Sequence, residues 1–284
     1  MRSSLNIYLA GLSVFDFLLL AMSVMIYPLM ETCLQQGDRG DVCHIFWYTS
    51  VFTYPVSLIA QTGSVWTCVA ITLDRFLAVK YPLHMRLWCT SKRAIWVLSF
   101  ITAFSIIYKI PSFFELSHDE CGRVTATSLR NHPLYIVLYI TYGNVFILLL
   151  IPWLIIIILN VVTVNAVRAA YKMRCQLRMN QRTEDNDRMT KMATVTIVAF
   201  ILFNSIAGFT QIIEGFSLKI PGQQYFLTVG NFLVCLNSAS NILIYSIFGR
   251  RFRKMAFNLV CPCISAHYQP LGRHLENKTQ VSAI

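Results

Sequence analysis

Long apolar stretches separated by short polar segments dominate this chain of 284 residues. Each stretch has about 20 or more largely apolar residues, enough to cross about 30 Å of hydrocarbon as a helix. They cover residues 5–30, 44–78, 94–114, 134–167, 192–215 and 223–247. Lipid offers backbone groups no hydrogen-bond partner, and the alternating pattern of transmembrane barrel strands does not occur in the sequence. The pattern therefore predicts an all-α membrane protein with six spanning helices.

Composition supports a bilayer environment. Hydrophobic residues make up 56% of the chain and charged residues 13%, whereas soluble domains carry about 25% charged residues. The net charge of +11 raises nucleic acid binding as an alternative, because a basic surface attracts phosphate. Here, however, the basic residues flank the apolar stretches. They are interpreted as determinants of topology and as contacts with the lipid bilayer, and no nucleic acid partner is expected.

Lys and Arg are unevenly distributed between the apolar stretches. They gather after the second and fourth stretches and after the sixth, whereas the intervening loops are acidic. The basic residues are Lys80, Arg86, Lys92 and Arg93, then Arg168, Lys172, Arg174, Arg178, Arg182, Arg188 and Lys191, and finally Arg250, Arg251, Arg253 and Lys254. Short cytosolic loops are enriched in such residues. This predicts a multi-pass plasma-membrane protein whose two ends lie in the cytosol, where the Asn277-Lys-Thr279 sequon stays unglycosylated.

The cysteines divide according to this topology. Cys33, Cys43 and Cys121 fall in outer segments, where an oxidising environment lets a disulfide persist. Cys261 and Cys263 follow a basic amphipathic stretch at 249–260. Palmitoylation at such a place anchors a short helix to the membrane surface. Free thiols are the alternative for this last pair.

Polar side chains within the apolar stretches indicate a buried ionic site. Asp16 lies in the middle of the first stretch, where an acid costs a few kcal/mol unless it faces a polar interior. Asn237 and Asn241 are four residues apart and share one helix face. Ser64 adds a hydroxyl from the second stretch. These four residues predict a hydrated pocket that holds a cation such as sodium next to Asp16, and no other cofactor is expected.

A second charged group ends the second apolar stretch. The sequence there reads Leu73-Asp74-Arg75-Phe76, followed closely by Lys80-Tyr81-Pro82-Leu83. An arginine at the cytosolic end of a spanning helix commonly extends its guanidinium toward water. Here the neighbouring Asp74 can hold it in place. A held guanidinium that can be released to a partner suits a switch.

These motifs together resemble those of the rhodopsin-like G-protein-coupled receptors. Asp74-Arg75-Phe76 resembles the Asp-Arg-Tyr signature of that family, and the other matches follow in the family's order. They are Leu12 with Asp16, Trp96, Pro152, the run Asn237-Ser-Ala-Ser-Asn241-Ile-Leu-Ile-Tyr245, and Phe248-Gly-Arg-Arg-Phe252-Arg. The resemblance covers the chain from Asn6 to Cys263. It implies that Asp74, Arg75, Phe76 and Tyr245 act on a heterotrimeric G protein.

The resemblance also divides the chain. Residues 1–260 are similar to the receptor domain, with a short cytosolic eighth helix at about 249–260, and 261–284 form a cytosolic tail. The family's first helix has no counterpart before Asn6, so the rhodopsin-like bundle is expected to lack it. Without that packing partner Asp16 is more exposed to lipid, and retention of the chain inside the cell is expected.

Within the family, the sequence is similar to those of invertebrate neuropeptide receptors of the FMRFamide type. The stretches that carry this likeness are Ile59-Ala-Gln-Thr-Gly-Ser-Val-Trp66, Pro111-Ser-Phe-Phe-Glu115 and Asn237-Ser-x-x-Asn241. It implies an extracellular peptide ligand that ends in Arg-Phe-amide. Glu214 and Glu115 are the acids expected to meet its arginine, with Gln211, Tyr54 and Gln61 lining the pocket below. The alternative is that both acids are merely solvated helix ends.

Two features depart from the family's pattern. Asn204, Ile206 and Ile242 stand where a tryptophan and two prolines are usual, so a hinge at Gly208 is expected to serve instead. The outer cysteine lies further from the signature arginine than the family's spacing, because Cys43 precedes Arg75 by 32 residues. The resemblance implies a Cys43–Cys121 disulfide, with Cys33 as the competing partner.

Other functions fit less well. An opsin needs a lysine in the last span, and the stretch from Tyr225 to Tyr245 has none. An enzyme would show a nucleophile with its base or a metal motif, and a transporter would show internal repeats; neither pattern occurs. A truncated, non-signalling receptor product and an orphan chemosensory receptor stay open as alternatives. The terminal Ser282-Ala-Ile284 matches peptides that bind PDZ domains by strand addition.

Overall fold

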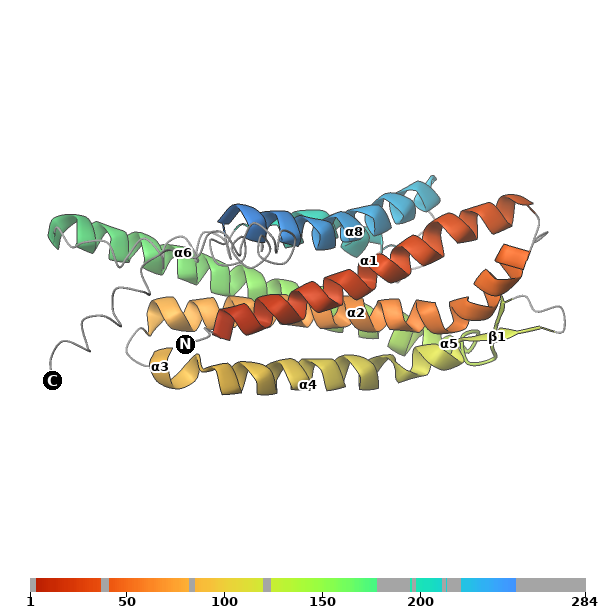
Figure 1. Ribbon diagram of the computed structural model, residues 1–284, viewed down its shortest axis with the longest axis horizontal. Helices are drawn as coiled ribbons and strands as arrows, with labels where there is room; N and C mark the ends of the chain where they lie inside the picture. The colour runs from red at the N-terminus through yellow and green to blue at the C-terminus, as the bar shows by residue number, and fades with distance from the viewer. Residues whose placement is uncertain are drawn as a thin grey trace, which may run out of the picture.

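The computed structural model describes residues 4–36, 41–81, 85–119, 124–177, 195, 198–210, 213 and 221–248, which form a helical bundle. Its helices are α1 (Ser4–Gln36), α2 (Asp41–Lys80), α3 (Met85–Trp88), α4 (Ser91–Lys109), η1 (Ile110–Phe114), α5 (Pro133–Tyr135), η2 (Ile136–Gly143), η3 (Val145–Leu150), α6 (Ile151–Leu177) and α8 (Gln223–Phe248). The long helices run along one axis of the molecule, and α2 packs against α1, α4 and α6 (Figure 1).

Four helical segments of the described chain are long and apolar enough to cross a membrane. They are Ser4–Met30, Val42–Lys80, Ser91–Phe114 and Pro133–Ala166. Their bounds agree with the first four predicted stretches to within a few residues. A shorter apolar helix, Val198–Thr210, falls inside the fifth predicted span, and α8 coincides with the sixth. The expected surface helix, its cysteines Cys261 and Cys263, and the tail lie outside the described residues.

The core of the bundle forms where α1 and α2 lie against each other. Leu5 and Leu12 of α1 are buried with Cys68 and Ile71 of α2, and Ile156 of α6 joins the same cluster. Gly63 of α2 permits this contact, because a Cβ atom there would collide with the ring of Phe15. In a membrane, packing between helices depends on such close approach, since lipid tails already solvate apolar side chains.

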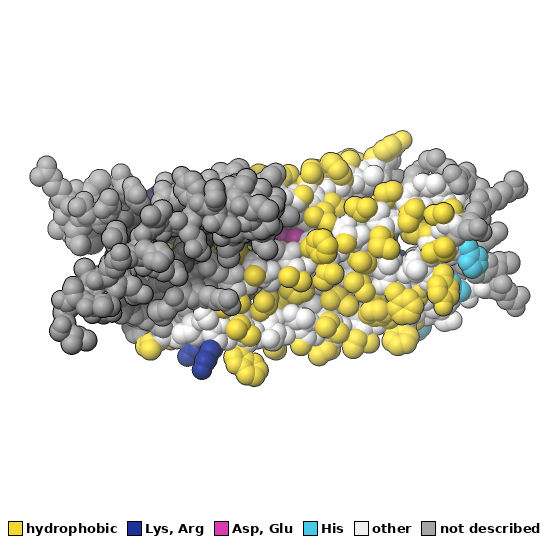
Figure 2. All heavy atoms as spheres, in the orientation of Figure 1, with side chains coloured by type: hydrophobic (Ala, Val, Ile, Leu, Met, Phe, Trp, Pro, Cys, Tyr) yellow, Lys and Arg dark blue, Asp and Glu magenta, His cyan; other side chains and the backbone are white. Residues whose placement is uncertain are grey.

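The outward faces of the helices are apolar. Phe17, Trp96 and Phe100 are 68%, 77% and 71% exposed, and Figure 2 shows hydrophobic side chains spread over the middle of the visible face. Water would make such a surface unfavourable, whereas hydrocarbon solvates it. The surface therefore agrees with a multi-pass membrane protein.

The two ends of the bundle differ. Lys80 ends α2, and Lys92 and Arg93 begin α4, and this end is called the basic end below. The opposite end carries a disulfide together with a two-stranded antiparallel hairpin, β1 (Leu116–His118) and β2 (Val124–Ala126), in which Ser117 pairs with Thr125. It is called the disulfide end. This hairpin was not predicted, because strands of three residues have too little alternation of polar and apolar positions to be recognised in a sequence.

The helix from Ile136 to Leu150 is π-helical rather than α-helical, in two segments separated by Asn144. An almost continuously apolar run has no periodicity that would distinguish the two helix types, so π-helical winding cannot be predicted from it. π-helical turns are frequent at functional sites. Here the altered winding places Asn144 against α4, where its Oδ1 accepts a hydrogen bond from Lys109.

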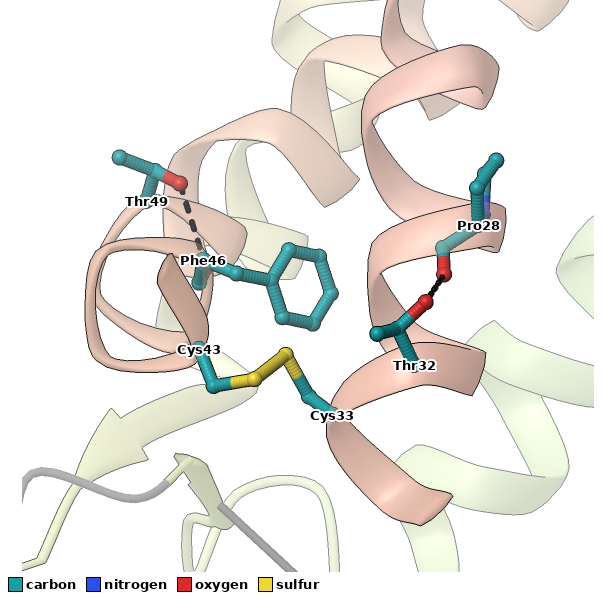
Figure 3. The surroundings of a disulfide bond; sticks show 6 residues. All are labelled: Pro28, Thr32, Cys33, Cys43, Phe46 and Thr49. Atoms are coloured by element: carbon teal, nitrogen blue, oxygen red, sulfur yellow. Dashed lines mark hydrogen bonds between the residues drawn. A yellow bond between two sulfur atoms is a disulfide. The ribbon is translucent and has the colours of Figure 1, made fainter. Parts of the chain in front are cut away.

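The disulfide joins Cys33 to Cys43, and the predicted Cys43–Cys121 pairing is wrong (Figure 3). Cys33 lies near the end of α1 and Cys43 near the start of α2, and their Cα atoms are 5.3 Å apart. This separation lies in the range that a disulfide needs. Phe46 packs beside the bond in the same buried cluster. Cys121 lies outside the described residues.

We predict that Cys33 and Cys43 protect one another from thiol reagents. Replacing Cys33 by Ser removes the partner of Cys43, so Cys43 should become labelled by a maleimide in denaturant without prior reduction, whereas Cys121→Ser should leave Cys43 protected. Mass-spectrometric peptide mapping of the labelled protein measures this directly. Labelling of Cys43 in the Cys121→Ser variant, with protection in Cys33→Ser, would contradict the pairing.

Candidate functional site

At the basic end, Asp74 and Arg75 form a buried ion pair at the end of α2. Both side chains are nearly inaccessible to solvent, at 6% and 8% exposure. Ser4 of α1 donates a hydrogen bond from Oγ to Asp74 Oδ1 at 2.6 Å. The Nε of Arg75 has no acceptor within the described residues. The pair is thus held by α1, while part of the guanidinium stays unsatisfied.

This ion pair can hold the end of α2 in one arrangement until a partner releases it. The Asp74–Arg75 pair is called the latch below. Removing one partner of a buried pair leaves an uncompensated charge and costs about 3–5 kcal/mol. A protein partner that offers the guanidinium new acceptors offsets that cost, so it can open the pair. The sequence located both charges but missed Ser4, because a serine at a helix start carries no signal of a contact 70 residues away.

The other two residues of the predicted switch are Phe76 and Tyr245. Phe76 stacks edge-on with Tyr81, with ring centroids 6.4 Å apart, and the Lys80 ammonium lies 5.4 Å from the centre of the Phe76 ring. The ring of Phe76 therefore packs on the loop that follows α2. Tyr245 lies in α8, and its side chain lies outside the described residues.

The thiol of Cys89 lies close to the Asp74–Arg75 pair. Its Sγ lies 3.9 Å from the backbone carbonyl oxygen of Asp74. Burial, reinforced by the negative charge of Asp74, raises the pKa of Cys89 to about 11. The thiol is therefore protonated at neutral pH and reacts slowly with alkylating reagents.

Midway along the bundle, Asp16 is buried between three helices. The carboxylate is 1% exposed, and its Oδ1 accepts hydrogen bonds from Ser64 Oγ of α2 at 2.8 Å and Ser238 Oγ of α8 at 2.9 Å. Ser238 was missed in the sequence, although it adjoins Asn237 and lies three residues before Asn241. Asp16 thus connects α1, α2 and α8.

The oxygens in this region suit a hard cation. Asn237 is buried, and its Oδ1 has no hydrogen-bond donor among the described residues. An unsatisfied amide oxygen and a carboxylate with two hydroxyl neighbours are the donor types that an alkali cation takes. The donor set therefore fits sodium, whose binding at Asp16 stays a prediction. The side chain of Asn241 lies outside the described residues.

A small cavity of about 20 Å³ lies at about the level of Ser64, because Gln61 and Val65 of α2 both line it. Its polar lining is Gln61 of α2 and Asn204 of the 198–210 helix; Val65, Leu148, Leu149, Trp153, Phe200, Ala207 and Gly208 complete it. A space of this size holds about one water molecule. Because asparagine is smaller than the tryptophan expected at position 204 from the family pattern, the cavity follows from that departure.

A cluster of polar side chains lies at the disulfide end between α4 and η2. Lys109 is buried, and its ammonium donates to Asn144 Oδ1 at 2.8 Å and lies 4.7 Å from the centre of the Tyr108 ring. Gly143 makes room for Tyr108, because a Cβ atom there would meet the tyrosine hydroxyl at 2.9 Å. The phenol of Tyr139 donates to the Tyr108 carbonyl at 2.8 Å.

Glu115 is the acid of this cluster, and its carboxylate has three partners. It forms an ion pair with Arg130. Its Oε1 accepts hydrogen bonds from Tyr135 Oη at 2.9 Å and Ser112 Oγ at 3.0 Å. The guanidinium of Arg130 also lies 6.0 Å from the centre of the Tyr54 ring. Glu115 is therefore neither a solvated helix end nor an open acid, because the chain supplies its own arginine.

The structure thus separates the residues expected to bind ligand. Tyr54 and Glu115 meet through Arg130, whereas Gln61 lines the cavity about two helical turns further along α2. Gln211 and Glu214 lie outside the described residues. Arg130 and Tyr135 were missed, because neither belongs to a motif and both are brought to Glu115 by the turn that follows β2.

The chain is similar to a family of receptors and to several of its members. A family model described as "7 transmembrane receptor (rhodopsin family)" matches residues 1–245. The FMRFamide receptor of Drosophila melanogaster is 29% identical over 265 residues, which cover 90% of this chain and 48% of that protein. The FMRFamide peptide receptor frpr-18 of Caenorhabditis elegans is 29% identical over 264 residues, covering 89% and 60%.

A mouse receptor is also similar. The neuromedin-U receptor 2 of Mus musculus is 22% identical over 288 residues, which cover 95% of this chain and 70% of that protein. The chain therefore spans between about half and two thirds of the length of these relatives.

Sodium should stabilise the folded chain through Asp16. A ligand present at about ten times its dissociation constant adds about 1.4 kcal/mol of stability, which corresponds to a rise of roughly 3–5 °C in the melting temperature. Thermal unfolding of the detergent-purified protein in sodium chloride, compared with choline chloride at equal ionic strength, measures it. Asp16→Asn should abolish the difference, and an equal rise in wild type and variant would exclude this site.

Proposed function

Because the chain belongs to the rhodopsin family of seven-transmembrane receptors, we propose that it is a receptor for an extracellular neuropeptide of the FMRFamide type that activates a heterotrimeric G protein. The observation that carries the second half of the proposal is the buried Asp74–Arg75 pair at the basic end, held from α1 by Ser4. The names of the two FMRFamide receptors that it resembles support the first half.

The proposed orientation places the basic end in the cytosol and the disulfide end outside. It rests on the Lys and Arg residues that border the spans, which favour a cytosolic location, and on the disulfide, which forms in an oxidising compartment. In this orientation a peptide reaches the Glu115 cluster from outside, and a G protein reaches the guanidinium of Arg75 from inside.

The cavity between these two ends gives the switch room to move. A helix changes its packing only where a second arrangement is sterically open. The 198–210 helix lies close to η3 at Gly208, where a Cβ atom would meet Leu149 Cδ1 at 2.5 Å, and the cavity lies beside this contact. We infer that rotation of this helix into the cavity takes the place of the proline hinges common in the family.

Loss of the Arg75 guanidinium should uncouple peptide binding from signalling. We predict that Arg75→Ala still binds Phe-Met-Arg-Phe-amide but loses most peptide-driven nucleotide exchange, because the group that enters the G protein is gone. GTPγS uptake in membranes containing receptor and G protein measures exchange, and radioligand binding on the same membranes measures affinity. Exchange at the wild-type level would contradict the assignment of Arg75 as the switch residue.

Removing the hydroxyl that holds Asp74 should have the opposite effect. Ser4→Ala deletes a hydrogen bond to a charged acceptor, worth about 1.5–3 kcal/mol, and should raise exchange in the absence of peptide by up to about tenfold if half of it acts on the switch equilibrium. Ser13→Ala is the matched control, because the Ser13 hydroxyl bonds only the Leu9 carbonyl of its own helix. Equal basal exchange in both variants would show that Ser4 does not restrain the latch.

A further inference from the structure

The Glu115 carboxylate is buried at the disulfide end, and each of its two oxygens has hydrogen-bond partners. Only 3% of its side chain is exposed. Two neutral donors, Ser112 Oγ and Tyr135 Oη, both bind Oε1, and Arg130 binds Oε2. The two neutral donors come from η1 and α5, which belong to the helical framework. One side of the carboxylate is therefore fixed by the framework and the other by a single long side chain.

Arg130 differs from the rest of the site in its accessibility. Its side chain is 36% exposed, about ten times the exposed fraction of its partner. The turn that carries it is anchored independently of the guanidinium. Thr127 donates from its amide to the Glu115 carbonyl at 3.0 Å and from Oγ1 to the Phe114 carbonyl at 2.6 Å. The guanidinium can therefore rotate into solvent while the turn, Glu115 and the two neutral donors stay in place.

The chemistry of the site favours a guanidinium. A planar guanidinium donates to carboxylate oxygens and stacks on aromatic faces, whereas an ammonium is a strongly hydrated point charge. The ring of Tyr54 supplies such a face. Burial by itself lowers the pKa of Arg130, but Tyr54 and Glu115 reverse that effect and the pKa is raised. The site thus holds its cation fully charged.

The site also lies at the end where a ligand would arrive. Glu115 directly precedes β1, and His118 of that strand stacks on Tyr48 of α2 with ring centroids 5.3 Å apart. His118 Nε2 also lies 3.3 Å from the Trp47 carbonyl oxygen. These contacts fix the hairpin to α2 beside the disulfide. The approach to Glu115 is thus bordered by a fixed hairpin, with Arg130 as its accessible charged group.

We propose that Glu115, with Tyr54 and Tyr135, forms the subsite for the arginine side chain of the peptide ligand, and that Arg130 is an internal stand-in which the ligand's guanidinium displaces. This inference rests on the proposed function, because it takes a peptide with a penultimate arginine as the ligand. Displacement of Arg130 differs from a simple acid–arginine contact in how the loss of Arg130 changes peptide affinity. Removing Arg130 strengthens binding of the peptide, since the competing guanidinium of the chain is lost.

The first test needs no peptide. Arg130→Ala should lower the melting temperature of the purified receptor, and methylguanidinium at millimolar concentration should restore part of the loss by entering the vacated position. Wild type should not respond, because Arg130 fills the site. The double variant Arg130→Ala/Glu115→Gln should not respond either, because the carboxylate is gone. Failure of methylguanidinium to stabilise Arg130→Ala selectively would overturn the subsite.

The second test measures affinity for Phe-Met-Arg-Phe-amide and for its citrulline analogue, which keeps the shape of arginine without its charge. Intramolecular competitors act at effective concentrations of about millimolar, so Arg130→Ala should raise affinity for the arginine peptide by about tenfold or more. Affinity for the citrulline peptide should change by less than about threefold, because it gains no ion pair. Asn131→Ala, an exposed neighbour in the same turn, is the matched control and should resemble wild type.

The two tests separate the subsite from the proposed receptor function. Selective rescue by methylguanidinium, in a receptor that binds neither peptide, would support a guanidinium site and contradict the FMRFamide-type ligand. Equal losses of affinity for both peptides in Arg130→Ala would mean that Arg130 only supports the fold, and the displacement mechanism would be wrong. Arg130→Lys keeps the charge and protects the fold, so it should lie between wild type and Arg130→Ala in affinity for the arginine peptide.

Discussion

The cost of burying charge in an apolar bundle governs this structure. A charged side chain away from water is tolerated only where other groups satisfy it. Asp16 is satisfied by hydroxyls from two other helices, Asp74 by its neighbour Arg75 and by α1, and Glu115 by a guanidinium and two hydroxyls. The sites of Asp16 and Asp74 therefore join helices that are far apart in sequence, whereas the site of Glu115 joins η1 to the turn and helix that follow β2. Changing the partner of one charge changes which helices are held together.

This constraint explains how such sites can act as switches. An ion pair or buried carboxylate has few alternative arrangements, and each alternative needs a new partner for the exposed charge. In the proposed function, such partners are a guanidinium from the peptide for Glu115, a sodium ion for Asp16 and acceptor groups of the G protein for Arg75. A ligand that binds one arrangement better than another shifts the population by that difference in affinity. The small cavity beside Asn204 lies between the two ends, where we propose that the 198–210 helix changes its packing.

The sequence predicted the parts of the fold that have strong periodic or local signals. Lengths of apolar residues gave the spanning helices, because membrane thickness sets a minimum length. The local motif around Arg75 and the buried Asp16 were also found, because charge within an apolar run stands out. In contrast, Ser4, Ser238 and Arg130 were missed. Each is an ordinary polar residue whose importance comes from a partner on another element, and a single sequence carries no record of such distant contacts.

The disulfide is a second example of a contact that a single sequence does not determine. Three cysteines on one side of the membrane allow several pairings, and the resemblance to the family favoured Cys43 with Cys121. The structure joins Cys33 to Cys43, which lie near the facing ends of α1 and α2. The π-helical winding around Asn144 could not be predicted from the sequence either. A uniformly apolar stretch is compatible with either type of helix, so tertiary contacts such as that with Lys109 decide between them.

The central claim is that the two ends of the bundle are coupled through these buried charges. Coupling is reciprocal for equilibrium binding, so a G protein at the basic end must change peptide affinity at the disulfide end. The most direct measurement is the affinity of the purified receptor for Phe-Met-Arg-Phe-amide with and without nucleotide-free G protein. The account predicts an affinity roughly 5–150-fold higher with the G protein. The same affinity in both conditions, with the G protein shown to be bound, would contradict it.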